Sequence, residues 1–166
     1  MKVKINLENE IIANLANEKI LKKIAKKVLK TVAQKKAQIS VTVYYVNEER
    51  IQKVNKDYRD KDCPTDVLSF RLIENKENLP LNKKSFPLEW DYASKTLYLG
   101  EIFICQEKAK NQAKEFGNSE YREVLELFIH GMLHLLGCDH HQADETTLMK
   151  SYEEKMMKIL DKMKII

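Results

Sequence analysis

Val-Leu-Glu-Leu-Phe-Ile-His-Gly-Met-Leu-His-Leu-Leu-Gly-Cys-Asp-His-His, residues 124–141, is the most informative stretch of this 166-residue chain. Every histidine of the chain lies in it, between positions 130 and 141. His130 and His134 are four residues apart, so on an α-helix their side chains project from one face. The apolar residues around them predict a buried helix, which would hold both imidazoles in fixed positions.

Gly137 is expected to end this helix. Glycine readily takes a positive φ just after a helix, and the resulting turn would bring His140 back towards the first two histidines. Catalytic zinc sites commonly have three protein ligands and leave one position for water or substrate. The spacing therefore predicts one zinc ion held by His130, His134 and His140.

Two other interpretations of the cluster stay open. Cys138, Asp139 or His141 could supply a fourth ligand and make a closed structural zinc site, and His141 also competes with His140 as the third ligand. Alternatively, the histidines could be core residues that are satisfied by hydrogen bonds. A helical pair, a glycine stop and a further histidine seldom coincide by chance, so the catalytic three-histidine site is favoured.

The spacing also separates two classes of metalloenzyme. Zinc proteases have His-Glu-x-x-His, extended by a glycine and a third histidine, and their glutamate is the general base. Gly131 stands in the place of that glutamate, so a protease of this class would lack its base. Residues 130–140 instead resemble the His-Gly-x-Leu-His-Leu-x-Gly-x-Asp-His signature of the YbeY family, the bacterial endoribonucleases and rRNA maturation factors. Cys138 departs from the signature, because the family usually has tyrosine there.

Further stretches carry the same resemblance. Residues 55–70, Asn-Lys-Asp-Tyr-Arg-Asp-Lys-Asp-Cys-Pro-Thr-Asp-Val-Leu-Ser-Phe, are similar to the family's Asn-x-x-Tyr-Arg-x-x-Asp-x-Pro-Thr-Asp-Val-Leu-Ser-Phe segment. Residues 99–102 resemble its Leu-Gly-Asp-Ile strand, and Met149 with Glu153 fits its last helix. Residues 71–97 differ, because they are longer and more polar than in a typical member.

The resemblance implies a function and roles for particular residues. It implies a zinc-dependent endoribonuclease, specific for single strands, that acts on ribosomal RNA and ribosomal particles in 16S rRNA 3′ end maturation and ribosome quality control. His130, His134 and His140 carry over as ligands of one Zn²⁺ ion, and Arg59 carries over as the catalytic arginine. The chemistry of Arg59 agrees, because a guanidinium offers a planar fork of donors to phosphate and keeps its charge at neutral pH.

Two alternative functions remain. One is a metallopeptidase-like hydrolase whose base comes from another segment, and Gly131 weighs against it. The other is a non-catalytic ribosome-assembly factor that zinc only stabilises, because a fold can keep a metal while acting through other contacts. No general base is evident from the sequence. Asp66, Glu101 and Asp139 are weak candidates, and attack by water is not separated from attack by the RNA 2′-hydroxyl.

Composition indicates one domain, 1–166, in which 71–97 is a long polar loop. The loop is either a mobile flap near the substrate or an insertion, and the insertion is favoured. Three cysteines without framework spacing and an N-terminus without an apolar signal core predict a cytoplasmic protein. No apolar run is long enough to span a membrane. The sequence does not indicate an oligomeric state.

The net charge of +4 is too small to indicate a nucleic-acid partner by itself. Six lysines between positions 19 and 30 would share one side of a helix predicted over 14–36. Such a ridge can follow an RNA backbone. An amphipathic surface helix must also turn polar residues outward, however, and the plain solvated face is the favoured interpretation.

Hydrophobic periodicity predicts the remaining elements. Alternation or β-branched and aromatic content predicts strands at 3–7, 39–45, 66–70 and 96–104, and the helical period with caps and stops predicts helices at 14–36, 47–57, 106–116, 119–136 and 143–163. Strands early and helices late indicate an α+β fold. We expect a single domain with a small mixed sheet of about four strands and about five helices, with the zinc site on a buried helix and the turn after it.

Overall fold

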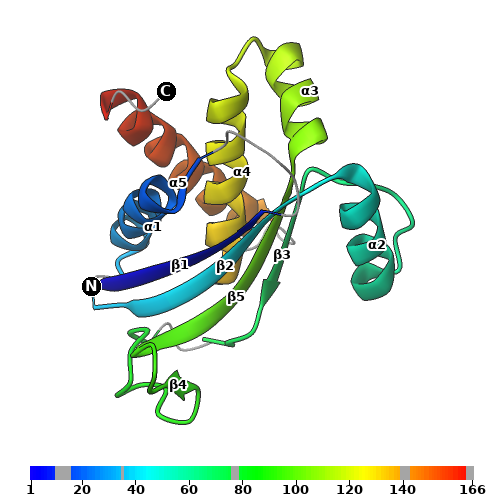
Figure 1. The fold of residues 1–166 in the computed structure, drawn as a ribbon. Coiled ribbons are helices and arrows are strands. Elements are labelled where there is room, and N and C mark those ends of the chain that lie inside the picture. The colour runs from blue at the N-terminus through cyan, green and yellow to red at the C-terminus, as the bar shows by residue number, and fades with distance from the viewer. Residues whose placement is uncertain (10–15, 35, 76–78, 139–142, 164–166) are drawn as a thin grey trace.

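A curved mixed sheet carries helices on both of its faces (Figure 1). The computed structural model describes residues 1–9, 16–34, 36–75, 79–138 and 143–163. The described strands are β1 (Lys2–Asn9), β2 (Gln38–Val46), β3 (Val67–Arg71), β4 (Trp90–Asp91) and β5 (Thr96–Cys105). The described helices are α1 (Glu18–Thr31), α2 (Glu48–Arg59), α3 (Gln106–Phe116), α4 (Glu120–Leu135) and α5 (Ala143–Lys162).

The strand order is β1-β2-β5-β3, and β4 pairs with β5 beside this path. β1, β2 and β5 run parallel, whereas β3 and β4 run antiparallel to β5. The predicted α+β fold with a mixed sheet is thus confirmed. The prediction missed β4, because two residues are too few to show a hydrophobic period.

Side-chain caps define where several helices begin. Asn47 accepts a hydrogen bond of 2.8 Å from the Arg50 amide at the start of α2, as predicted. Asn17 accepts from Ile20 N at 3.2 Å, so α1 begins at residue 18 rather than at 14. The stop predicted for α3 is also present, because Gly117 follows it with a φ of 69°.

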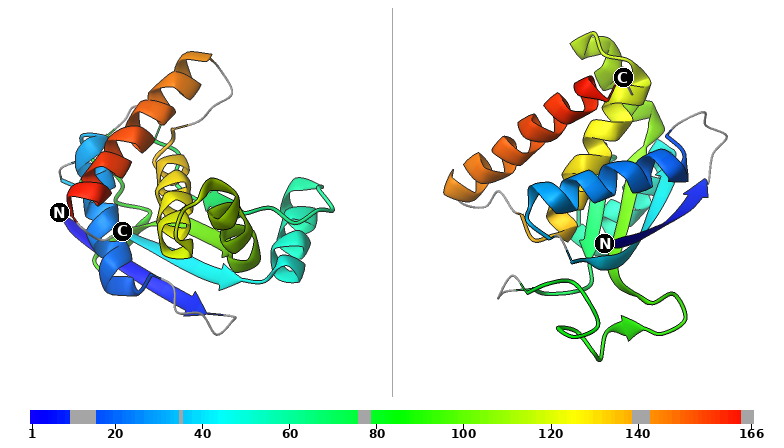
Figure 2. Two further views of the ribbon diagram at one scale, coloured as in Figure 1. Left: turned by 90° about the horizontal axis from the view of Figure 1, so that it is seen from above. Right: turned by 90° about the vertical axis from the view of Figure 1, so that its left-hand side faces the viewer.

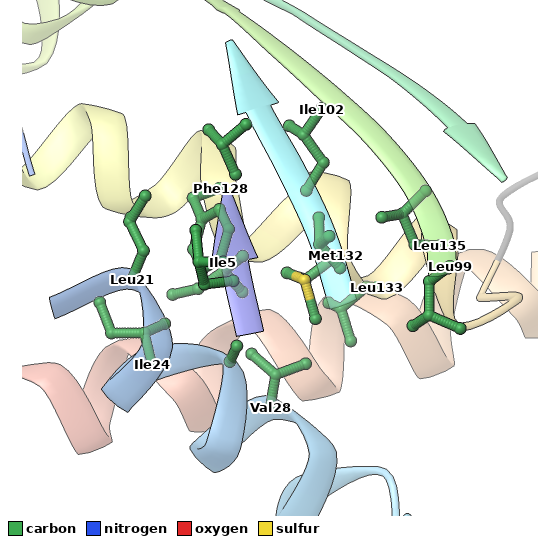
Figure 3. Packing of buried hydrophobic residues seen from close by; sticks show 14 of the residues in the cluster. Ile5, Leu21, Ile24, Val28, Leu99, Ile102, Phe128, Met132, Leu133 and Leu135 are labelled. Carbon is green, nitrogen blue, oxygen red and sulfur yellow. The ribbon is translucent and has the colours of Figure 1, made fainter. Parts of the chain in front are cut away.

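The main core lies between the sheet and helices α1, α4 and α5 (Figure 3). α4 is buried along most of its length, as its apolar sequence predicted. Gly131 of α4 faces β5, where a Cβ would come within 2.9 Å of Ile102 Cγ2. Glycine therefore allows α4 to pack closely on the sheet at this point.

α5 packs on α1 and α4 (Figure 2). Met149, Met156 and Leu160 of α5 are buried in the main core, which agrees with the helical spacing of its apolar residues. Thr31 of α1 donates its hydroxyl to Met156 Sδ at 3.5 Å. None of the helices in the described part of the chain is long and apolar enough to cross a membrane.

A second, smaller core lies on the opposite face of the sheet. α2 covers one end of this face, across the strands from α4 (Figure 1). The members of this smaller core are Val46, Ile51, Val54, Leu68, Phe103 and Cys105, with Tyr44 and Phe70 packed against them. The rest of this face is not covered by a helix among the described residues.

The segment 71–97 is more than a polar loop. Ile73, Leu81, Phe86 and Trp90 are buried and join the main core. The Gln38 amide donates to the Leu81 carbonyl at 2.7 Å, which fixes the segment beside the start of β2. Its polar composition hid these anchors, because they are single apolar residues without a helical or strand period.

Candidate functional site

A cleft of about 700 Å³ lies between β3 and helices α4 and α5. β3 is an edge strand, and its alternate residues Val67, Ser69 and Arg71 face the cleft. His130 and His134 enter it from α4. His130 and His134, which belong to the most informative stretch of the sequence, therefore lie in a cavity large enough for a small ligand or part of a polymer.

The two helical histidines meet in this cleft. Nε2 of His130 lies 3.0 Å from Nε2 of His134. Nδ1 of His130 lies 2.8 Å from Oε1 of Glu153 on α5. An ionised carboxylate only accepts hydrogen bonds, so His130 Nδ1 donates and, in the neutral ring, Nε2 carries its lone pair towards His134. A carboxylate behind a histidine is the usual support of a metal ligand.

The chemistry of this pair fits a zinc ion. Two imidazole nitrogens bound tetrahedrally to one ion at about 2.0–2.1 Å are about 3.3 Å apart, close to the observed separation. Within the described ranges, however, no group of three or more His, Cys, Asp or Glu side chains is arranged to hold a metal. The predicted third ligand His140, with Asp139 and His141, lies outside the described residues. The structure thus brings together two of the three predicted ligands.

The turn after α4 is as predicted. Gly137 has a φ of 91°, which glycine adopts without strain. A Cβ on Gly137 would also lie 2.6 Å from Nη1 of Arg71. Glycine at this position therefore has a second role, because it makes room for the Arg71 guanidinium against the turn. Cys138, a candidate fourth ligand, lines the cleft, and burial raises the pKa of its thiol.

Arg59, the predicted catalytic residue, is the last residue of α2 and lies at the rim of the cleft. Its Nη2 donates to the Ser69 carbonyl on the free edge of β3 at 3.3 Å. In the part of the chain that the structure describes, no carboxylate forms an ion pair with Arg59 or with Arg71. Two guanidiniums without a carboxylate partner among the described residues therefore border the cleft that holds the histidines.

The three weak candidates for a general base have different positions. Asp66 lines the cleft, where it accepts from Gln112 Nε2 at 2.9 Å. Glu101 does not line the cleft, and it accepts from the Tyr98 hydroxyl at 3.2 Å. Asp139 lies outside the described residues. Of these three candidates, only Asp66 therefore lines the cleft among the described residues.

Three cleft residues were missed from the sequence as site residues. Arg71 could have been found, because it follows the Pro-Thr-Asp-Val-Leu-Ser-Phe run and shares a strand face with Ser69. Glu123 precedes His130 by two helical turns and so lies on its face. It is buried, and burial raises the pKa of its carboxyl. Glu153 was noted only as part of the family's last helix, and its contact with His130 was not predictable, because only the packing of α5 brings the two residues together.

Comparisons with known proteins indicate the family to which this chain is similar. The family model described as Endoribonuclease YbeY matches residues 4–161. A protein named Endoribonuclease YbeY from Caldanaerobacter subterraneus subsp. tengcongensis is 45% identical over 123 residues, which are 74% of this chain and 75% of the relative. One of the same name from Carboxydothermus hydrogenoformans is 42% identical over 120 residues, covering 72% and 71% of the two chains.

The fold has a solved counterpart as well. The solution structure of TM1509 from Thermotoga maritima matches with a TM-score of 0.56 and 28% identity, over 95% of this chain and 92% of that one. The resemblance predicted from the motifs is therefore confirmed, and the chain belongs to the YbeY family of endoribonucleases.

Proposed function

We propose that the chain is a zinc-dependent endoribonuclease of the cytoplasm that cleaves single-stranded RNA and acts on ribosomal RNA, in maturation of the 16S rRNA 3′ end. One observation carries the proposal. Two imidazoles converge to 3.0 Å in a cleft that is also bordered by two guanidiniums without a carboxylate partner among the described residues. Its membership of an endoribonuclease family supports a phosphodiester as the bond that is cut.

His130 and His134, with His140 as the predicted third ligand, would hold the zinc ion. When bound, such an ion supplies Lewis-acid stabilisation of a phosphate oxygen and lowers the pKa of water. Glu153 keeps the His130 ring in the orientation and tautomer that direct Nε2 into the cleft.

Arg59 and Arg71 bind the phosphodiester and orient it. Arg71 is held against Gly137, and Arg59 is held on the edge of β3 through Ser69. Guanidiniums pair with two phosphate oxygens at once, and they stabilise the negative charge that increases on those oxygens during displacement. A guanidinium also keeps its positive charge at neutral pH.

Position 131 argues against the peptidase alternative. Gly131 faces Ile102 on the sheet rather than the cleft, so even a glutamate there would not point at a bond held by the histidines. The base of a His-Glu-x-x-His protease thus has no place in this packing. Another group, such as Asp66, would have to accept the proton, whether the attacking group is water or the RNA's own 2′-hydroxyl.

An assay on structured RNA with a single-stranded tail tests the proposal. The purified protein, with its metal quantified, is compared with His134→Ala and Arg59→Glu. Lys53→Glu is the matched control, because Lys53 is an exposed cation on the same helix and does not line the cleft. We expect Arg59→Glu to cleave at least about 100-fold more slowly, as when other transition-state donors are lost. His134→Ala should not cleave, and Lys53→Glu should match the wild type.

Two results would contradict the proposed function. Cleavage that survives in both cleft variants would come from a contaminating nuclease and would remove these residues from the site. Absence of wild-type cleavage, together with unfolding of His134→Ala, would instead favour structural zinc in an assembly factor.

A further inference from the structure

Four aromatic rings form a continuous cluster on the face of the sheet turned away from α4. Tyr44 stacks on Phe103 with ring centroids 4.4 Å apart and planes 8° apart. Phe70 meets Phe103 edge-on at 5.9 Å, and Tyr58 lies 5.3 Å from Phe70. We call Tyr44, Tyr58, Phe70 and Phe103 the aromatic cluster. It runs from the centre of the sheet to its free edge, because β2, β5 and β3 are neighbours in that order.

The cluster becomes more exposed towards that edge. Phe103 is buried, Tyr44 and Phe70 are half-buried, and Tyr58 is 73% exposed. Leu72, the next residue of that face beyond β3, is 62% exposed. Packing of an apolar core does not explain why the Tyr58 side chain is so exposed to solvent. Neighbouring exposed apolar side chains of this kind commonly mark a binding surface.

Arg59 joins the aromatic cluster to the cleft. Its guanidinium carbon lies 5.7 Å from the centre of the Phe70 ring, while the same side chain borders the cleft and binds the Ser69 carbonyl. Phe70 and Ser69 are adjacent on β3, and they point to opposite faces of the sheet. β3 therefore contributes one residue to the cleft that holds the histidines and the next residue to the aromatic cluster.

We propose that Tyr58 and Phe70 stack with unpaired bases of the RNA strand whose phosphate lies in the cleft. The proposal rests on the function proposed above. Bases splayed from a single strand stack on aromatic side chains without strict sequence preference, and an adjacent arginine adds contacts to base and phosphate. A paired helix hides its base faces, so this surface would select single strands over duplexes.

The charges around Tyr58 predict how this contact responds to salt. Asp57 and Asp60 flank Tyr58 and Arg59 in sequence and are exposed. The local surface is thus not strongly cationic, and affinity there comes from stacking rather than from counterion release. Loss of a ring should weaken RNA binding equally at low and high salt, whereas loss of Arg71 should reduce the salt dependence itself.

Binding of a fluorescently labelled, single-stranded RNA oligonucleotide tests the proposal. It is measured by anisotropy with the full chain freed of metal by chelation, so that cleavage does not interfere. Tyr58→Ala should weaken binding about 5- to 150-fold, the range expected for one lost stacking contact. Tyr58→Trp should bind as the wild type does, and an oligonucleotide with abasic positions should bind wild type and Tyr58→Ala equally. Phe116→Ala is the matched control, because Phe116 is 64% exposed on α3 and outside the cluster.

The outcomes separate this inference from the proposed function. Wild-type binding that Tyr58→Ala leaves unchanged overturns the stacking surface alone, whatever the cleavage assay shows. Failure of the wild type to bind any single strand overturns both. If Tyr58→Ala instead abolishes a dimer seen by sedimentation, with RNA affinity unchanged, the cluster is a protein interface and the inference is wrong.

Discussion

Arg71 and Gly137 illustrate how single residues shape this site. The sequence predicts that Gly137 ends the helix. The second role of this glycine depends on the side chain of Arg71, which lies 66 positions earlier in the chain. Any Cβ there would displace the guanidinium of Arg71 from the turn. The same residue thus ends α4 and leaves space for the Arg71 guanidinium, and only the first role is visible in local sequence.

Glu153 gives the first prediction at this scale. Replacement by glutamine should lower zinc affinity by about 10- to 100-fold, because the His130 ring loses its charged hydrogen-bond partner. Competition with a chromophoric chelator measures the affinity. Glu154→Gln is the control, because Glu154 is exposed on the same helix and does not line the cleft. Equal affinities for the two variants would show that Glu153 does not support a metal ligand.

Glu123 gives a prediction about pH. Burial raises the pKa of its carboxyl, so the folded state favours the protonated form. The stability this contributes is present below the ordinary glutamate pKa of about 4.3 and is lost as pH rises through the raised value. Glutamine is neutral at every pH. Glu123→Gln should therefore be more stable than the wild type near pH 7, and this gain should shrink towards pH 4.

Urea unfolding of both proteins between pH 4 and pH 8 measures this difference. Glu115→Gln, at an exposed position of α3, controls for the general effect of removing a carboxylate. A gain from Glu123→Gln that does not change with pH would mean that the carboxyl titrates alike in the folded and unfolded chains.

At the scale of elements, helices and strands with a strong period were predictable and the contacts between them were not. Asn47, Gly117 and Gly137 have the capping or stopping roles expected from their positions. β4 and the buried anchors of segment 71–97 were missed, because short or isolated apolar residues have no period. The aromatic cluster was also missed, because its rings come from β2, α2, β3 and β5 and meet only in the folded sheet.

The lysine ridge of α1 gives a prediction about an element. α1 packs on β1, at the opposite edge of the sheet from β3, and does not line the cleft. Replacing exposed Lys19, Lys23 and Lys30 together by glutamine should leave RNA cleavage within about 2-fold of the wild type at moderate salt, because screening weakens charges beyond about 10 Å. Loss of cleavage comparable to that of Arg59→Glu would make the ridge part of the RNA path.

At the scale of the whole molecule, the site lies where the two faces of the sheet meet at β3, one packed in the main core and the other in the smaller core. The main core fixes α4 and with it His130 and His134, whereas the smaller core fixes α2 and with it Arg59. β3 contacts both, since Leu68 packs in the smaller core and Val67 packs against the main core. We therefore expect the relative positions of the histidines and the arginine to depend on apolar packing and not on the metal.

Removal of the metal tests this independence. The chelated protein should stay folded and unfold cooperatively, because α4 is held by buried apolar side chains of the main core. Added zinc at about 100 times its dissociation constant should stabilise it by about 2.7 kcal/mol, which corresponds to a rise in Tm of about 5–10 °C for a chain of this size. Circular dichroism during heating measures both, and His134→Ala should show a much smaller rise. Loss of the helical signal on chelation alone would instead mean that zinc folds the chain, as in structural sites, and the assembly-factor interpretation would replace the enzyme.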